Sequence, residues 1–358
     1  MTFGYIIPNI YVFIRIWQLF ISKEHRLAYV LVYLLIASIY PLSNILDGGD
    51  FLEKVTDYLL PYYLYLFLFV LLLDIILLLN YVFKIISAGE LKNPSLRKIL
   101  FRVILILPLA VVGIGIINFK TIRTSEYSIE IPSKASKAKH IKIAFLADFH
   151  LQEGIDIGFV KRFAEKIEEI NPDIILYGGD IVEDRRSEGD TTAYEKIIRK
   201  ITARHGSYAV LGNHEHYSGH DRGSFHDKTN ITLLRDTVVI VDNLFNLAGR
   251  NDRERKSIDD ILKLADDSLP VILIDHRPTD IINISKTAVD VSFSGHTHNG
   301  QMFPINLIVK SMYELSHGYR MIGNTHFFVT SGIRLWGPPV RTTGKSEIVV
   351  VNIEFTGN

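Results

Sequence analysis

The ten residues Ile141-Lys-Ile-Ala-Phe-Leu-Ala-Asp-Phe-His150 join an apolar run to two side chains that commonly bind metals. The run 141–147 is short, rich in β-branched and aromatic residues and followed at once by a polar side chain, which is typical of a buried strand. Loops at the carboxyl ends of strands in open α/β sheets converge on one crevice, so polar residues placed there are candidates for a binding site. Asp148 and His150 are therefore the first candidate site residues.

The same arrangement of an apolar run followed by a polar cluster occurs four more times. With the first, the polar clusters are Asp148-Phe-His150, Gly178-Gly-Asp180, Gly212-Asn-His-Glu215, Asp275-His-Arg-Pro278 and Gly295-His-Thr-His298. Each cluster alone has a simpler explanation, because an Asp after a strand often caps a helix and Gly-Asn is ordinary turn chemistry. Five in succession favour one shared site at the ends of the strands.

The side chains in these clusters are suited to metal binding. The sequence contains no cysteine, so a metal site must use His, Asp, Glu or Asn. Carboxylates, an Asn and several imidazoles suit Mn, Fe or Zn, and geometry rather than affinity selects among these ions. About seven candidate ligands are too many for one tetrahedral ion and favour two ions that share a bridging carboxylate, as in enzymes of phosphate-ester hydrolysis.

From about residue 124 onward, short apolar runs alternate with polar helical stretches. The expected strands are 127–131, 141–147, 174–177, 207–211, 238–241, 271–274, 289–293, 326–330 and 347–355. The expected helices are 157–170, 191–203 and 257–266. Strands that alternate with helices early and then follow one another predict a mixed α/β fold with more than one layer.

Residues 1 to about 120 have a different character, because they contain most of the long apolar runs. A helix needs roughly 20 apolar residues to cross a hydrocarbon core about 30 Å thick. Four windows approach that length, namely 4–22, 27–46, 59–82 and 103–119. The sequence therefore predicts a membrane anchor of about four helices over residues 1–120 and a second domain over residues 124–358. Arg15 and Asp74 lie inside two of the windows, where a charge is costly unless it faces a partner.

Loop charges predict how the anchor is oriented. The loops 23–26 and 84–102 are basic, whereas the loop 47–57 is acidic. Basic loops stay on the cytoplasmic side, so the last helix should lead outward and place the second domain on the extracytoplasmic face of the plasma (inner) membrane. Four lysines soon after this helix, Lys134, Lys137, Lys139 and Lys142, weaken this prediction of sidedness.

The ordered motifs resemble those of the calcineurin-like metallophosphoesterase superfamily. The family pattern Asp-x-His, Gly-Asp, Gly-Asn-His-Asp/Glu, His, Gly-His-x-His is matched by Asp148-Phe-His150, Gly179-Asp180, Gly212-Asn-His-Glu215, His276 and Gly295-His-Thr-His298. The match covers about residues 125–355 and is most similar to the bacterial membrane-anchored branch of YkuE- and YaeI-like phosphoesterases. This resemblance implies a two-sheet β-sandwich flanked by helices, with two divalent metal ions at its rim.

The resemblance also implies a role for each motif residue. One ion would be bound by Asp148, His150 and His298, the other by Asn213, His276 and His296, and Asp180 would bridge them. His214 would contact the substrate phosphate and act as general acid toward the leaving group, and Glu215 would orient His214. Hydrolysis would proceed by attack of a metal-activated hydroxide on phosphorus, without a covalent intermediate.

Together these inferences favour a membrane-anchored, metal-dependent phosphoesterase that hydrolyses a phosphoester or phosphodiester near the membrane surface. The expected partners are the lipid bilayer and a phosphorylated substrate that is lipid-linked or part of the cell envelope. Nucleic acid is not expected, because acidic and basic residues balance at 39 each. One alternative is a UDP-2,3-diacylglucosamine-type pyrophosphatase of lipid A synthesis, whose site would face the cytoplasm. Another is a membrane receptor without catalysis, in which metal ligands would be expected to be lost.

Overall fold

The structure is a computed structural model of the whole chain, and it describes residues 2–45, 49–152, 155–183, 192–219 and 224–357. The chain forms two compact units, which are described separately. The first unit consists of Met1–Ile117 and Gly337–Thr342, and the second of Asn118–Trp336 and Thr343–Asn358. The first unit therefore includes a short segment from near the end of the chain, which the sequence did not predict.

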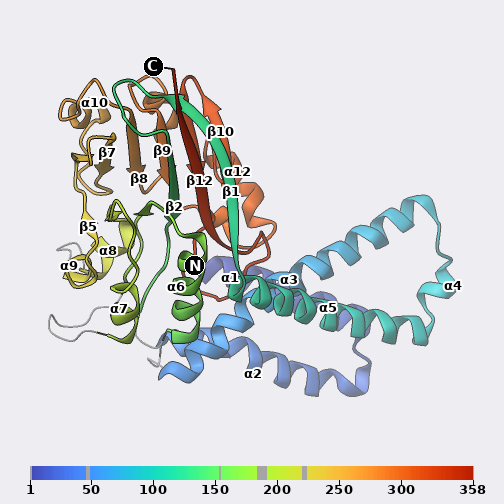
Figure 1. Cartoon of the computed structure of the whole chain (residues 1–358). Coiled ribbons are helices and arrows are strands. Elements are labelled where there is room, and N and C mark those ends of the chain that lie inside the picture. The colour runs from blue at the N-terminus through green and yellow to red at the C-terminus, as the bar shows by residue number, and fades with distance from the viewer. Residues whose placement is uncertain (1, 46–48, 153–154, 184–191, 220–223, 358) are drawn as a thin grey trace. The chain divides into compact units, whose positions relative to one another are not determined.

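The first unit is helical (Figure 1). Its helices are α1 (Thr2–Phe20), the short 3-10 turn η1 (Lys23–His25), α2 (Arg26–Ile45), α3 (Gly49–Phe83), the short α4 (Ala88–Leu91) and α5 (Pro94–Lys120). Three stretches of the described residues are long and apolar enough to cross a membrane, namely Lys23–Ile45, Phe51–Phe83 and Pro94–Lys120. They contain the described parts of the predicted windows 27–46, 59–82 and 103–119.

The predicted window 4–22 corresponds to α1, which forms a helix but is not among these three stretches. Asn9, Arg15 and Gln18 interrupt its apolar sequence. The predicted count of about four spans is therefore approximate. Arg15 nevertheless has the partner that a charge in an apolar environment needs, because its Nε and Nη2 donate to the Asp74 carboxylate of α3 at 2.6 and 2.5 Å.

The second unit contains two six-stranded sheets. The strands of the first sheet, in spatial order, are β1 (Ile122–Pro132), β12 (Ser346–Thr356), β2 (His140–Leu146), β3 (Ile174–Tyr177), β4 (Ser207–Ala209) and β5 (Thr232–Leu233). Those of the second are β10 (Gly318–Ile322), β11 (Thr325–Val329), β9 (Val291–Ser294), β8 (Val271–Asp275), β7 (Phe245–Arg250) and β6 (Thr237–Val241). Within each sheet the strands that precede polar clusters run parallel, namely β2, β3 and β4 in one and β8 and β9 in the other.

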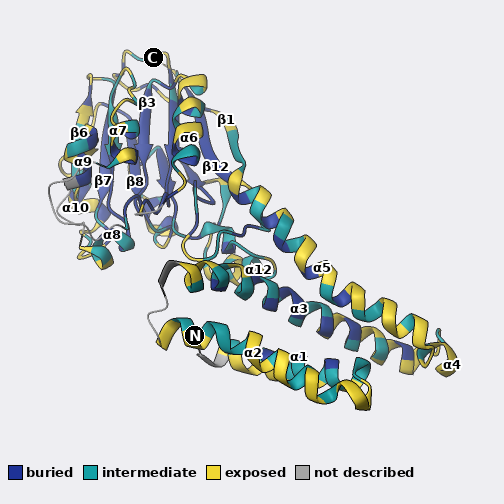
Figure 2. Ribbon diagram, turned by 90° about the horizontal axis from the view of Figure 1, so that it is seen from below, coloured by how far each residue is buried: buried dark blue, intermediate teal, exposed yellow. Residues whose placement is uncertain are grey.

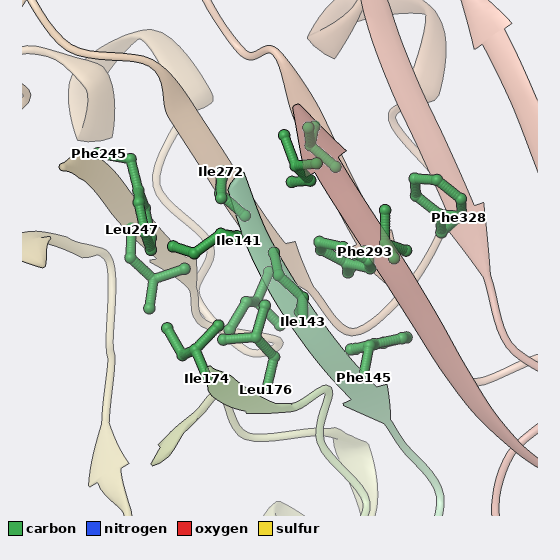
Figure 3. Close-up of a cluster of buried hydrophobic side chains, with 14 of the residues drawn as sticks. Ile141, Ile143, Phe145, Ile174, Leu176, Phe245, Leu247, Ile272, Phe293 and Phe328 are labelled. Carbon is green, nitrogen blue, oxygen red and sulfur yellow. The ribbon is translucent and has the colours of Figure 1, made fainter. Parts of the chain in front are cut away.

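The main hydrophobic core lies between the two sheets (Figure 3). Side chains alternate between the two faces of a strand, so Ile143 and Phe145 of β2 enter this core while Ala144 and Leu146 pack on the opposite face. From the second sheet, Phe245, Leu247, Ile272, Phe293 and Phe328 complete the core. The strands β3, β7, β8, β9 and β11 are wholly buried, as the dark blue strands in Figure 2 show, whereas the edge strands β5, β6 and β10 are partly exposed.

Helices flank the two sheets. They are α6 (Ile157–Ile170), α7 (Ala193–Ile198), α8 (Asn213–Ser218), α9 (Ser224–Thr229), α10 (Ile258–Leu262), α11 (Ile281–Ile284) and α12 (Ile305–Met312), with the 3-10 turn η2 (His298–Gly300) before α12. The α6 helix follows the predicted pattern and buries Phe159, Phe163 and Ile167 against the first sheet. The predicted two-sheet sandwich flanked by helices is confirmed.

Several element boundaries differ from the sequence prediction. The expected helices 191–203 and 257–266 are shorter, at Ala193–Ile198 and Ile258–Leu262, and residue 191 lies outside the described residues. The strands β5, β7 and β10 were not predicted. Of these, β7 is wholly buried although it contains Asn246 and Arg250, which weaken its apolar pattern. Asn246 is tolerated there because its amide donates to the carbonyl of Asp266 and accepts from that residue's backbone N–H, both at 2.9 Å.

Candidate metal centre

The nine residues predicted for the site follow the carboxyl ends of five parallel strands. They are Asp148 and His150 after β2, Asp180 after β3, Asn213, His214 and Glu215 after β4, His276 after β8, and His296 and His298 after β9. Side chains of six of them form two groups of three. Within each group, the ligand atoms all lie within 4.8 Å of one another. These groups are Asp148, His150 and His298, and Asp180, His276 and His296.

The first group has the spacing of metal ligands. The Nε2 atoms of His150 and His298 are 3.3 Å apart, and Nε2 of His298 is 3.8 Å from Oδ1 of Asp148. Two ligand atoms bound tetrahedrally at about 2.1 Å from one ion would be separated by about 3.4 Å. Oxygen and imidazole nitrogen are also the donors that divalent Mn, Fe and Zn accept. The group therefore fits a divalent metal ion.

The second group is centred on His276. Its Nε2 lies 3.2 Å from Oδ2 of Asp180 and 3.3 Å from Oδ1 of Asn213. Its Nδ1–H donates a hydrogen bond to the carbonyl oxygen of Gly178 at 2.8 Å, which leaves the Nε2 lone pair directed at the other candidate ligands. Asn213 thus joins Asp180, His276 and His296, as the resemblance implied, and this group also fits a divalent ion.

The two groups adjoin each other, because the backbone N–H of His296 donates to the Asp148 carboxylate at 3.0 Å. Both Asp148 and Asp180 are almost fully buried. Burial raises the pKa of Asp148 to about 6, the Asp180 charge acts in the same direction, and His276 and His150 oppose this rise. Two buried carboxylates whose charges repel each other need positive charge around them, which divalent ions would supply.

The backbone at the ligands is left-handed. The φ angles of Asp148, His150, Asp180, His296 and His298 are 58°, 49°, 53°, 71° and 49°. A residue other than glycine in this region costs about 1–3 kcal/mol and persists only where the surroundings enforce it. Here neighbouring strand ends enforce it, since the N–H of Asp148 donates to the carbonyl of Gly179 and that of His150 to the carbonyl of Asp180.

Two glycines at the centre are required by close packing. A Cβ at Gly212 would lie 2.2 Å from Oδ1 of Asp180, and a Cβ at Gly295 would lie 2.6 Å from Oδ2 of Asp148. Both distances are far below van der Waals contact, so no larger residue fits without displacing a candidate ligand. Gly295 thus gives the backbone room beside His296.

A sequence model of the calcineurin-like phosphoesterase domain matches residues 141–300, which include all nine predicted site residues. A metallophosphoesterase of Aquifex aeolicus is 30% identical over 251 residues, which cover 66% of this chain and 94% of the relative. The chain belongs to the calcineurin-like metallophosphoesterase family. The predicted likeness to YkuE is confirmed as well, since YkuE of Bacillus subtilis is 28% identical over 255 residues, with 66% of this chain and 86% of YkuE covered.

In other relatives, the part that matches this chain makes up less than two thirds of the relative's length. A Helicobacter pylori metallophosphoesterase is 34% identical over 225 residues, and the chain spans 60% of that relative's length, with 60% of this chain covered. A zebrafish protein named as a transmembrane protein with a metallophosphoesterase domain is 26% identical over 283 residues, which cover 73% of this chain and 64% of the zebrafish protein. The name of this zebrafish relative thus describes a transmembrane protein that contains such a domain.

Glu183 is a site residue that the sequence analysis missed. Its Oε1 lies 2.6 Å from Nδ1 of His150 and 2.5 Å from Nδ1 of His214. These distances are those of short hydrogen bonds and are too small for two ligands of one ion, so Glu183 accepts a hydrogen bond from each imidazole. Burial raises the pKa of Glu183, but the hydrogen bonds from His150 and His214 outweigh burial and lower it to about 2. Glu183 therefore stays ionised and fixes both rings.

Glu215 corrects one sequence prediction. Its Oε2 accepts from the backbone N–H groups of Gly212 and Asp180 at 2.8 and 3.0 Å, and its Oε1 from those of Ile181 and Val182 at 2.5 and 3.1 Å. Among the described residues, no hydrogen bond joins Glu215 to the His214 imidazole, which pairs with Glu183. The prediction that Glu215 orients His214 is therefore wrong. Glu215 instead holds the turn that carries Asp180.

Glu215→Gln is expected to destabilise the phosphoesterase domain. An amide offers one acceptor oxygen and turns an NH2 group toward backbone donors, so buried N–H groups lose their partner at about 1–3 kcal/mol each. We expect the thermal unfolding midpoint of the full chain in detergent to fall by roughly 5–15 °C. The control is Glu165→Gln on the exposed side of α6, which should leave the midpoint unchanged. Equal midpoints for Glu215→Gln and the parent would contradict this role.

An open recess of about 410 Å³ lies beside His214 in the phosphoesterase domain. It is lined by Glu183, His214, Tyr217, Ser218 and Trp336. The rings of Tyr217 and Trp336 are centred 5.7 and 5.9 Å from the His214 imidazole, and both are exposed. Two exposed aromatic rings beside one imidazole are suited to contact a substrate group. Neither residue belongs to a motif that was recognisable in the sequence.

Proposed function

We propose that this chain is a membrane-anchored phosphoesterase that uses two divalent metal ions to hydrolyse a phosphoester or phosphodiester near the membrane surface. The observation that carries the proposal is the pair of adjoining ligand groups around Asp148 and Asp180, each with metal-ligand spacing. Bound Mn, Fe or Zn ions would lower the pKa of a nucleophilic water and neutralise the phosphate oxygens. The relatives that bear the metallophosphoesterase name support the same reaction class.

The chain's own residues would divide the remaining tasks. Asp148, His150 and His298 would hold one ion, Asn213, His276 and His296 the other, and Asp180 would bridge them. His214 stays free of both groups, yet its ring is centred 4.8 Å from that of His150. Because Nδ1 of His214 is held by Glu183, its Nε2 is available to donate a proton to the leaving oxygen in the recess.

The proposal predicts that hydrolysis depends on bound metal. We expect the purified full chain to hydrolyse a chromogenic phosphodiester, to lose activity by about 100-fold or more after chelation, and to regain it with Mn, Fe or Zn. Elemental analysis should find about two ions per active chain. Comparing bis-p-nitrophenyl phosphate with p-nitrophenyl phosphate establishes diester or monoester preference. A chain that carries both ions without any hydrolysis would instead favour the receptor alternative.

We propose the extracytoplasmic face of the plasma membrane as the location of the phosphoesterase domain. The proposal depends on the basic segment 84–102, which places the start of α5 on the cytoplasmic side. If α5 then crosses the bilayer, its end lies on the outside, whether or not α1 also crosses. The absence of native cysteine allows a direct test. Leu264→Cys, on the exposed surface of the phosphoesterase domain, should react with a membrane-impermeant maleimide in intact spheroplasts.

Reaction of Leu264→Cys only after lysis would contradict the extracytoplasmic location. It would favour the alternative of a cytoplasmic site that cleaves the pyrophosphate of a nucleotide-linked acylated sugar. The labelling experiment therefore tests the location of the domain separately from its activity. A domain on either face of the membrane can show the metal-dependent hydrolysis described above.

A further inference from the structure

The α12 helix carries an apolar stripe on its outside. Ile305, Ile308, Val309 and Met312 recur at the spacing of one helix face. Such a stripe normally faces a protein core, yet no residue of α12 is buried, and Ile305, Ile308 and Met312 are 36%, 61% and 68% exposed. Leu307, at 56%, adds to the exposed apolar surface. Within the described part of the chain, this stripe has no protein core to cover it.

Hydrogen bonds connect the η2 turn, which precedes α12, to the segment that contacts the end of α5. Asn299, in the η2 turn before α12, donates from its Nδ2 to the carbonyl of Thr343 at 3.0 Å. Ser346, three residues further on, donates from its Oγ to the carbonyl of Phe119 at 2.6 Å. Phe119 is the penultimate residue of the candidate span Pro94–Lys120.

The residues after α12 also contact the segment around Ser346. Nε2 of His317 lies 3.1 Å from Oε2 of Glu347, whose other oxygen accepts from Arg123 at 2.9 Å. Arg123 is the second residue of β1, which begins two residues after α5 ends. The segments that precede and follow α12 are thus hydrogen-bonded to Thr343 and Glu347, on either side of the residue, Ser346, that contacts Phe119 near the end of the last candidate span.

We propose that α12 lies in the interface of the lipid bilayer, with the stripe formed by Ile305, Ile308 and Met312 among the lipids. An amphipathic helix binds such an interface through its apolar face, and Lys310, on the other side, suits the headgroup region. This inference rests on the proposed membrane anchoring, and it adds that the phosphoesterase domain itself contacts lipid.

The contact has a consequence for the substrate. The η2 turn that precedes α12 begins at His298, a candidate metal ligand. A helix lying in the interface would therefore hold the metal centre close to the headgroup layer, where the phosphate of a membrane lipid lies. The substrate class that this arrangement favours is a phosphoester whose leaving group or remaining group is anchored in the bilayer.

A fluorescence experiment on the full chain tests the contact without relying on catalysis. Because the chain has no cysteine, Ile308→Cys provides a single labelling site for an environment-sensitive NBD probe. In vesicles of phosphatidylcholine and phosphatidylglycerol, we expect blue-shifted emission and roughly twofold or greater quenching by lipids with a nitroxide near the headgroup. Leu264→Cys, 57% exposed and away from α12, is the matched control and should show water-like emission.

Water-like, unquenched emission at position 308 would overturn the proposal. So would a blue shift that is insensitive to nitroxide lipids and grows with the protein-to-lipid ratio, because that result would identify a second copy of the chain as the occupant. A chain that shows no phosphoesterase activity can still pass this test, so failure of the proposed function and failure of the lipid contact are distinguishable.

A second measurement connects the contact to the substrate. The double variant Ile308→Glu, Met312→Glu should hydrolyse phosphatidyl-p-nitrophenol in vesicles about tenfold more slowly, since charged side chains are expelled from the interface. Its hydrolysis of bis-p-nitrophenyl phosphate in solution should equal that of the parent. Leu264→Glu should change neither rate. Equal losses on both substrates in the double variant would show that α12 supports the fold and not the lipid contact.

Discussion

Asp180→Asn is expected to lower kcat/KM for a chromogenic phosphodiester by about 10³-fold and to reduce the metal content to about one ion per chain or less. The Asp180 carboxylate is buried, lies 3.2 Å from His276 and accepts the backbone N–H of His214 at 2.7 Å. Asn keeps the shape and tolerates the left-handed backbone at this position, so the variant removes charge with little change in conformation. Metal content is measured by elemental analysis beside the hydrolysis rate.

The matched control for this substitution is Asp236→Asn. Asp236 also has a positive φ, at 46°, and its carboxylate also accepts a backbone N–H, that of Asn251 at 3.0 Å, but it belongs to neither ligand group. We expect parental metal content and parental activity for the control. If Asp180→Asn retained two ions and parental turnover, the bridging role would be untenable.

His214→Asn is expected to lower kcat by about 10²–10⁴-fold while both ions remain bound. The loss should depend on the leaving group. An alkoxide departs only with a proton, whereas p-nitrophenolate is stable without one, so a methyl p-nitrophenyl phosphate should lose far less activity than a dialkyl phosphate. His140→Asn, an exposed histidine at the start of β2, is the control and should match the parent on both substrates.

A uniform loss across leaving groups would contradict the general-acid role of His214 and would indicate a role in binding the phosphate. Unchanged activity on both esters would contradict any catalytic role for this residue. Because bound metal is measured in the same samples, a loss of ions cannot be mistaken for a loss of the proton donor.

The ligand residues were predictable from sequence because parallel strands place their following loops at one edge. Asp148, His150, Asp180, His276 and His298 each follow a buried apolar strand. Parallel pairing within each sheet aligns these positions at one edge, and the packing of the two sheets brings the two edges together. Their division into two groups came from the family resemblance and agrees with the distances in the structure. That each group binds one ion stays a prediction.

The two errors around His214 have physical causes. The family resemblance implied that Glu215 orients His214, but the two are consecutive residues of a helix, whose side chains point about 100° apart and do not face each other. Glu183 was overlooked because it begins a charged stretch that resembles a solvated loop. The isolated bridge between Leu151 and Val182 carries it beside His150, and such a pairing leaves no trace in local sequence.

One part of the domain organisation depends on packing between distant parts of the chain and could not be predicted from sequence. The segment Gly337–Thr342 belongs to the helical unit, where the N–H of Arg341 donates to the carbonyl of Gly115 at 3.0 Å. A Cβ at Gly115 would lie 2.5 Å from Val340, so a glycine inside the apolar window 103–119 is needed for this approach. In the sequence, the same glycine is merely an unremarkable small residue in an apolar run.

The left-handed ligand backbone has a consequence for how variants of this protein behave. Each of the five left-handed ligand positions costs about 1–3 kcal/mol, and together they oppose the folding of the domain. The metal centre and the stability of the fold therefore compete, and the buried sheets must supply the difference. A glycine in place of a ligand removes the centre and the strain together. A variant that no longer binds metal can thus melt at a higher temperature than the parent, and high thermal stability is no sign of an intact centre.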